Sequence, residues 1–256
     1  MRVAIIGSGN VATILGEKIC VAGHEVLQVY SRDPAAAHKL AVLVGGRPVS
    51  RPGDLDSSAD LYLIAVSDSA IAEVAGWLRV NDGLVVHTAG SVVMEVLRPC
   101  SPNYGVLYPL QSLRREITPS AEIPLLVDGS NSESLEQLFN FGRTIAGTVQ
   151  GADDQKRMKL HISAVIMNNF TNHLYTLASD YCKKENIDFR LLMPLILETS
   201  ERLKFRSPGE LQTGPAVRND SGTIRNHLEQ LQNYPDLSEI YRLFTEKILD
   251  YYHDSD

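Results

Sequence analysis

The feature that most constrains the fold is a glycine-rich turn within the first twelve residues. A β-branched run at 3–6 ends in this turn, and apolar residues at helical spacing follow, which predicts a strand, a tight turn and a helix. Gly7 permits the sharp turn, Gly9 lets the backbone approach a pyrophosphate, and Ala12 keeps the helix close to the strand. A helix N-terminus also offers free N–H groups to phosphates. We therefore predict a dinucleotide site formed by Gly7, Ser8, Gly9, Asn10 and Val11; the alternative is a turn that only joins a strand to a helix.

The residues up to about 150 alternate between short apolar runs and helical patterns. Strands are predicted at 3–6, 25–30, 61–66, 83–87, 105–108, 123–127 and 147–150. Helices are predicted from residue 11, from Pro34, over 69–78 and over 132–141, with Ser91 as the cap of one more. This alternation predicts an α/β doubly wound (Rossmann) domain over residues 1–150.

The character of the sequence changes after Gly151, where no strand pattern continues. Long helical patterns cover 153–183, 189–205, 220–231 and 237–251. The sequence therefore predicts an all-α second domain over residues 151–256.

The end of the second predicted strand indicates which dinucleotide would bind. NAD sites usually carry an Asp or Glu there that bonds the ribose 2′-hydroxyl. Here the strand ends in Tyr30, followed by Ser31 and Arg32, and a hydroxyl with a guanidinium suits a 2′-phosphate. We predict NADP as the cofactor, with Ser31 and Arg32 at its 2′-phosphate. The alternatives are a solvated Arg32 and an Asp33 that reaches a ribose or caps the next helix.

Ligands of open parallel sheets bind beyond the carboxyl ends of the strands, which points to further candidates. Val66 and Ser67 follow the strand at 61–66, and we predict that they line the ribose and nicotinamide side. His87 ends the next strand, where a neutral imidazole could orient a substrate or move a proton. A hydrogen bond from His87 to a neighbouring backbone group is an equally good interpretation.

Polar residues also mark one face of the long apolar helix at 153–183. His161, Asn168 and Asn172 share that face in a regular α-helix. Because buried amides must be hydrogen-bonded, they either bond other helices or face a substrate. We predict His87, His161 and Asn168 as the catalytic candidates.

Composition limits the partners and the location. The net charge of −7 argues against a nucleic-acid partner or an anionic membrane. There is no apolar run long enough to cross a membrane, and Arg2 is followed by only four apolar residues, which do not form a signal peptide. Three widely spaced cysteines form no metal-binding cluster and suggest free thiols in a reducing compartment. We therefore expect a cytoplasmic protein that acts on a small molecule, without a metal.

The predicted helical domain is apolar on more than one side. Ile162, Val165 and Phe170 lie too far around the first long helix to be buried by one neighbouring layer. Exposed apolar patches of that size are rare in monomers. We expect a homodimer formed through this domain. The alternative is that the first domain alone buries the apolar surface.

With these residues assembled, the chain resembles the NADP-dependent oxidoreductases related to pyrroline-5-carboxylate reductase and ketopantoate reductase. More particularly, it is similar to proteins of that group with a Rossmann-like domain and a helical C-terminal domain of unknown function. The motifs that carry the resemblance are 7–12, 65–71 and 87–91 in the first domain, and 161–164, 168–170, 194–199 and 212–216 in the second.

The resemblance implies a C-terminal domain of the 6-phosphogluconate dehydrogenase type and hydride transfer between nicotinamide and a small carbonyl, hydroxyl or imine substrate. Two features depart from the patterns of related proteins. Such proteins carry a His at the position of Tyr108, and related hydroxyacid dehydrogenases place a catalytic Lys four residues before an Asn on the long helix. Neither Lys156 nor Lys159 is followed by that Asn four residues later. The alternative function is therefore a non-catalytic regulatory or scaffold protein that binds NADP(H). A deazaflavin, in place of a small substrate, is a further alternative as the molecule that is reduced.

Overall fold

The computed structural model describes residues 1–117 and 122–253 of the chain, and these form two compact units. The first unit is Met1–Asn168 and the second is Asn169–Asp256. The division falls inside a long helical segment, whereas the boundary predicted from the sequence precedes that segment.

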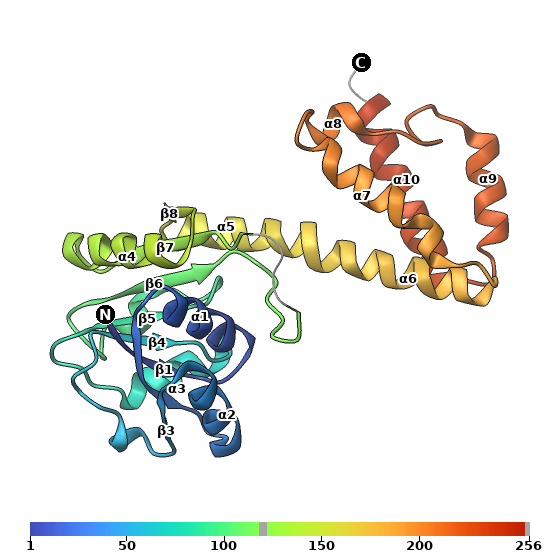
Figure 1. Cartoon of the computed structure of the whole chain (residues 1–256). Helices are drawn as coiled ribbons and strands as arrows, with labels where there is room; N and C mark the ends of the chain where they lie inside the picture. The colour runs from blue at the N-terminus through green and yellow to red at the C-terminus, as the bar shows by residue number, and fades with distance from the viewer. Residues whose placement is uncertain (118–121, 254–256) are drawn as a thin grey trace. The chain divides into compact units, whose positions relative to one another are not determined.

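The first unit is built on one sheet (Figure 1). Its strands are β1 (Arg2–Ile6), β2 (Glu25–Tyr30), β3 (Arg47–Val49), β4 (Leu61–Ile64), β5 (Leu84–His87), β6 (Tyr104–Pro109), β7 (Leu125–Gly129) and β8 (Val149–Gly151). The order across the sheet is β3-β2-β1-β4-β5-β6-β7-β8, and all neighbouring pairs are parallel except β6 with β7. The chain starts in the middle of the sheet and winds outward in both directions, which confirms the predicted doubly wound α/β fold.

The helices of the first unit connect these strands. They are α1 (Asn10–Val21), α2 (Pro34–Val44), α3 (Asp68–Trp77), α4 (Ser132–Ile145) and α5 (Asp154–Ala164), with short 3-10 turns η1 (Pro52–Asp54) and η2 (Met94–Leu97). The α2 helix begins as the sequence predicts, because Pro34 occupies its first turn and Asp33 accepts hydrogen bonds from the backbone N–H groups of Ala35 and Ala36.

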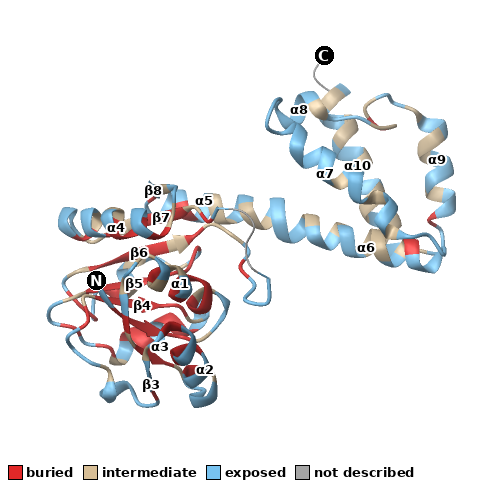
Figure 2. Ribbon diagram, viewed as in Figure 1, coloured by how far each residue is buried: buried red, intermediate tan, exposed pale blue. Residues whose placement is uncertain are grey.

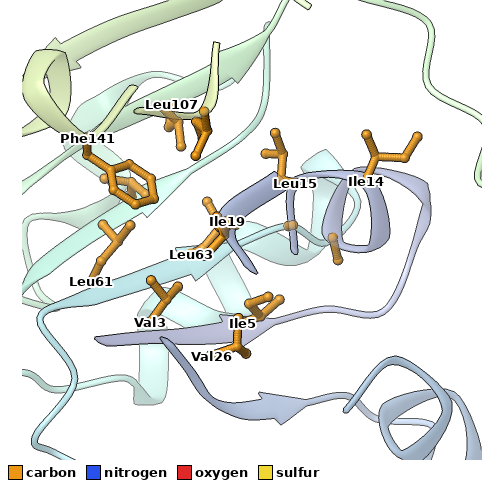
Figure 3. Packing of buried hydrophobic residues seen from close by; sticks show 14 of the residues in the cluster. Val3, Ile5, Ile14, Leu15, Ile19, Val26, Leu61, Leu63, Leu107 and Phe141 are labelled. Carbon is orange, nitrogen blue, oxygen red and sulfur yellow. The ribbon is translucent and has the colours of Figure 1, made fainter. Parts of the chain in front are cut away.

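Alternate residues of the parallel strands bury opposite faces of the sheet. Val3 and Ile5 of β1 pack with α1, α2 and α4, as Figure 3 shows for one cluster. Ala4 and Ile6, between them in sequence, pack on the other face with α3 and η2. Both faces are therefore covered, which explains why the strands are continuously apolar rather than alternating.

The second unit is helical in the part that the structure describes. It contains α6 (Thr171–Lys184), the 3-10 turn η4 (Phe189–Leu192), α7 (Met193–Arg202), α8 (Pro208–Leu211), α9 (Ser221–Gln230) and α10 (Pro235–His253). Buried residues are concentrated in the first unit, while the helices of the second are mostly half-buried or exposed (Figure 2). This confirms the predicted all-α character of the second half. None of the described helices is both long and apolar enough to cross a membrane.

Two details differ from the sequence prediction. Ser91 caps no helix: its hydroxyl donates to Asp68, and the chain instead forms the short turn η2, which Val93 precedes. The long helix is interrupted between α5 and α6 by a π-helical segment, η3 (Val165–Phe170). A π-helix closes wider turns than an α-helix, so α-helical spacing does not hold across Val165–Phe170.

Candidate functional site

A cavity of about 520 Å³ lies at the carboxyl ends of β1, β2 and β4. All nine residues predicted to bind a cofactor line it: Gly7, Ser8, Gly9, Asn10, Val11, Ser31, Arg32, Val66 and Ser67. The remaining lining is Tyr30, Ala65, Ala70, Glu73, Val74, Trp77 and Leu113. Residues that are far apart in the sequence are thus brought together at the edge where ligands of this fold bind.

The glycine turn shapes the floor of this cavity. Gly7 has φ of +120°, and a Cβ there would meet the carbonyl oxygen of Ala65 at 2.1 Å. A side chain is therefore excluded at Gly7 by the fold itself. At Gly9 a Cβ would meet nothing within 4 Å, so this glycine leaves open space in front of the helix.

The N-terminus of α1 adjoins that open space. Gly9 is its N-cap and supplies no side chain to accept the first N–H groups, and no acidic residue lies in the first turn. These N–H groups and the positive end of the helix dipole suit a pyrophosphate.

A hydroxyl and a guanidinium lie at the end of β2. The hydroxyl of Ser8 donates to Ser31 Oγ over 2.9 Å, which links the glycine turn to the second strand. Arg32 Nη1 lies 3.5 Å from Glu73 Oε2 of α3. Both side chains are largely exposed, so the pair is loosely held and a ligand phosphate can compete for Arg32.

A second polar group lies at the carboxyl ends of β5 and β6. Tyr108 Oη is 3.0 Å from His161 Nδ1, and the rings meet edge to face. Gly90 makes room for both, because a Cβ there would stand 2.7 Å from His161 and 2.9 Å from Tyr108. Burial, aided by the charge of Asp68, raises the pKa of Tyr108, so its hydroxyl keeps its proton at neutral pH.

His87 is fully buried at the end of β5 and does not line the cavity. Its Nδ1 accepts a hydrogen bond from the backbone N–H of Ala89, while Nε2 has no partner in good geometry among the described residues. Burial, helped by the charge of Arg157, lowers the pKa of His87 to about 4. The ring is therefore neutral at physiological pH and holds the loop that follows β5.

A buried cation fixes the same loop to α5. Arg157 is 1% exposed, and its Nη2 donates to Val92 O at 2.5 Å and to Asp154 Oδ1 at 2.6 Å. Asp154 Oδ1 also accepts from the backbone N–H of Met94 at 3.0 Å. The loop and the first half of the long helix are thus tied together beside Tyr108 and His161.

The structure does not place Asn168 with His161 on one regular helical face. Asn168 is exposed and lies in the π-helical segment, whose wider turns shift the positions after Val165. The predicted shared face of His161, Asn168 and Asn172 rests on α-helical spacing, which the π-helical segment Val165–Phe170 does not keep.

Sequence reasoning missed two participants in these clusters. Glu73 reaches the cavity from α3, and Trp77 of the same helix meets Tyr30 edge to face with ring centroids 5.4 Å apart. Glu73 and Trp77 are four residues apart and so share one face of α3. This spacing predicts that both reach the cavity once that face is known to lie at the strand ends. Tyr108, where the related group carries a His, was not among the predicted site residues, yet its hydroxyl contacts His161.

The fold and the glycine-turn cavity define a protein in which a Rossmann-like domain precedes a helical domain. Family models match both parts: a Rossmann-like domain over residues 1–111 and a domain of unknown function (DUF2520) over residues 123–248. The chain belongs to the family that combines these two domains. No curated protein matches the sequence.

Several solved structures are similar over nearly the whole chain. A candidate NADP oxidoreductase from Bacteroides fragilis is 36% identical, with a TM-score of 0.90 and coverage of 97% of this chain and 98% of that one. A 1-pyrroline-5-carboxylate reductase from Streptococcus pyogenes shares the fold at 14% identity, with a TM-score of 0.68 and 98% of each chain covered. An imine reductase from Myxococcus stipitatus in complex with NADP⁺ also shares the fold, at 15% identity and with a TM-score of 0.63. The match covers 100% of this chain and 94% of that one.

Proposed function

We propose that the protein is an NADP-dependent oxidoreductase that acts on a small carbonyl, hydroxyl or imine substrate. The observation that carries this proposal is the cavity in which the glycine turn, the open N-terminus of α1 and Arg32 meet. The 36% identical Bacteroides fragilis structure, whose name refers to NADP, supports the same cofactor.

The residues present fit this cofactor. The open space at Gly9 and the uncapped N–H groups of α1 would accept the pyrophosphate. Ser31 and Arg32 would hold the 2′-phosphate, and Val66 and Ser67 would line the path towards the nicotinamide.

When bound, NADPH supplies a hydride to a carbonyl or imine carbon. The product oxygen or nitrogen then needs a proton, which the hydroxyl of Tyr108 would donate. His161 holds the Tyr108 hydroxyl in place through the 3.0 Å contact between Nδ1 and Oη. Because His87 is buried and neutral, we assign it the role of supporting the loop after β5.

The first experiment measures NADPH binding by fluorescence and by calorimetry. We expect saturable binding to the wild type and little binding to Gly9→Val, which fills the space for the pyrophosphate. Absence of binding at millimolar cofactor would contradict the proposal.

The second experiment measures turnover. NADPH oxidation is followed with 1-pyrroline, small keto acids and small aldehydes, and the reverse reaction with hydroxyacids. We expect activity with one of these classes, lost in Tyr108→Phe and reduced in His161→Ala, while NADPH binding is retained. Binding without turnover of any class would favour a regulatory or scaffold protein that senses NADP(H).

A further inference from the structure

The end of the cavity predicted to hold the ribose 2′ group contains an acidic side chain, Glu73, as well as the basic side chain of Arg32. An NAD site usually carries an acid at the end of β2, but here Tyr30 is followed by Ser31. The acid nearby, Asp33, caps α2 and does not line the cavity. A carboxylate nevertheless lines the same cavity, because Glu73 reaches it from α3 beside Arg32.

The position of Glu73 gives it a direct effect on Arg32. Arg32 Nη1 and Glu73 Oε2 are 3.5 Å apart, with 72% and 62% of their side chains exposed. An exposed pair of this kind is weak, so either partner can exchange the other for a ligand group. A 2′-phosphate would gain Arg32 but would stand close to a like charge, whereas a 2′-hydroxyl could donate a hydrogen bond to the carboxylate.

We propose that Glu73 is a specificity-determining residue that opposes Arg32 at the ribose 2′ position. Arg32 favours NADP, and Glu73 favours NAD by repelling the 2′-phosphate and accepting from the 2′-hydroxyl. The wild-type protein therefore binds both dinucleotides, with a modest preference for NADP. This inference rests on the proposed dinucleotide binding, and it assigns to α3 a selectivity that this fold usually places at the end of β2.

The test is calorimetric titration of NADP⁺ and NAD⁺ into the wild type, Glu73→Gln and Arg32→Gln. Gln keeps the shape of Glu and removes only the charge. We expect Glu73→Gln to bind NADP⁺ about threefold to tenfold more tightly and NAD⁺ a few-fold more weakly. We expect Arg32→Gln to bind NADP⁺ about ten- to a hundred-fold more weakly, with little change for NAD⁺.

A matched control separates this local effect from the change in net charge. Glu17 is an exposed residue of α1 that does not line the cavity, so Glu17→Gln makes the same charge change elsewhere. A Glu73→Gln variant that matches Glu17→Gln, or that shifts both cofactors in the same direction, would overturn the inference while leaving dinucleotide binding intact. A wild type that binds neither NADP⁺ nor NAD⁺ would instead overturn the proposed function, and this inference with it.

Discussion

At the scale of single residues, two glycines in one turn have separate tasks. Gly7 has positive φ and no room for a Cβ, so Gly7→Ala should destabilise the fold by several kcal/mol or prevent folding. Gly9 has extended backbone and open space, so Gly9→Ala should change stability by less than about 1 kcal/mol and weaken NADPH binding. Urea unfolding and fluorescence titration of both variants measure the two effects. Equal stability losses would contradict this division of tasks.

His87 makes the stability of the protein sensitive to acid. Its pKa is lowered from 6.5 to about 4 by burial, so the unfolded chain takes up a proton that the folded chain does not. Stability should therefore fall as pH falls from about 6.5 towards 4, by roughly 2–3 kcal/mol between pH 7 and pH 4.5. Urea unfolding at both pH values measures the loss, and His87→Asn should show a loss smaller by that amount. The same pH dependence in both proteins would show that His87 titrates normally.

The residues of the cavity could be predicted to different degrees from the sequence. The glycine turn and the ends of β2 and β4 are local signals, because each lies directly after a recognisable strand. Glu73 was out of reach, since its role depends on its contact with Arg32, which lies 41 positions away in the sequence. The same holds for Tyr108 and His161, which are 53 positions apart.

At the scale of elements, Asp154 and Arg157 join the loop after β5 to the start of the long helix. Asp154→Ala removes the carboxylate that neutralises the buried Arg157 and that accepts from Met94 N. We expect a loss of about 3 kcal/mol in the free energy of unfolding, measured by urea titration. Asp153→Asn is the control, because Asn retains the N-cap that Asp153 gives to α5. Comparable losses of unfolding free energy in both variants would show that the carboxylates stabilise only the first turn of α5 and not the contact with the loop after β5.

The elements were predictable where apolar periodicity was long and regular. The sequence prediction missed the edge strand β3 and the short helix α8, which contain three and four residues and therefore show little periodicity. The π-helical segment was also missed, since Val165–Phe170 carries no Pro or Gly to mark an interruption. An interruption of this kind changes which side chains share a face, so the predicted polar face beyond His161 cannot be derived from α-helical spacing.

At the scale of the whole molecule, the second unit exposes many large apolar side chains. On η4 and α7, Leu191 is 74% exposed and Leu195 is 65% exposed. Leu197 and Phe205 are exposed nearby in the chain. Water-exposed apolar surface of this extent is unusual for a monomer. We propose that a second copy of the chain covers it, because two-fold pairing is the commonest symmetry of oligomers and buries the same patch on both copies.

Sedimentation equilibrium at micromolar concentration tests this pairing. The chain mass is 28.2 kDa, so we expect a species of about twice that mass for the wild type. Leu191→Glu and Leu195→Glu introduce charges where the apolar surface would be buried, and each should shift the equilibrium towards the single chain. Leu43→Glu is the control, since Leu43 is also an exposed leucine but lies on α2 of the first unit. A wild type that sediments as a single chain would contradict pairing. Pairing through the second unit would also be contradicted if Leu43→Glu dissociates as readily as Leu195→Glu.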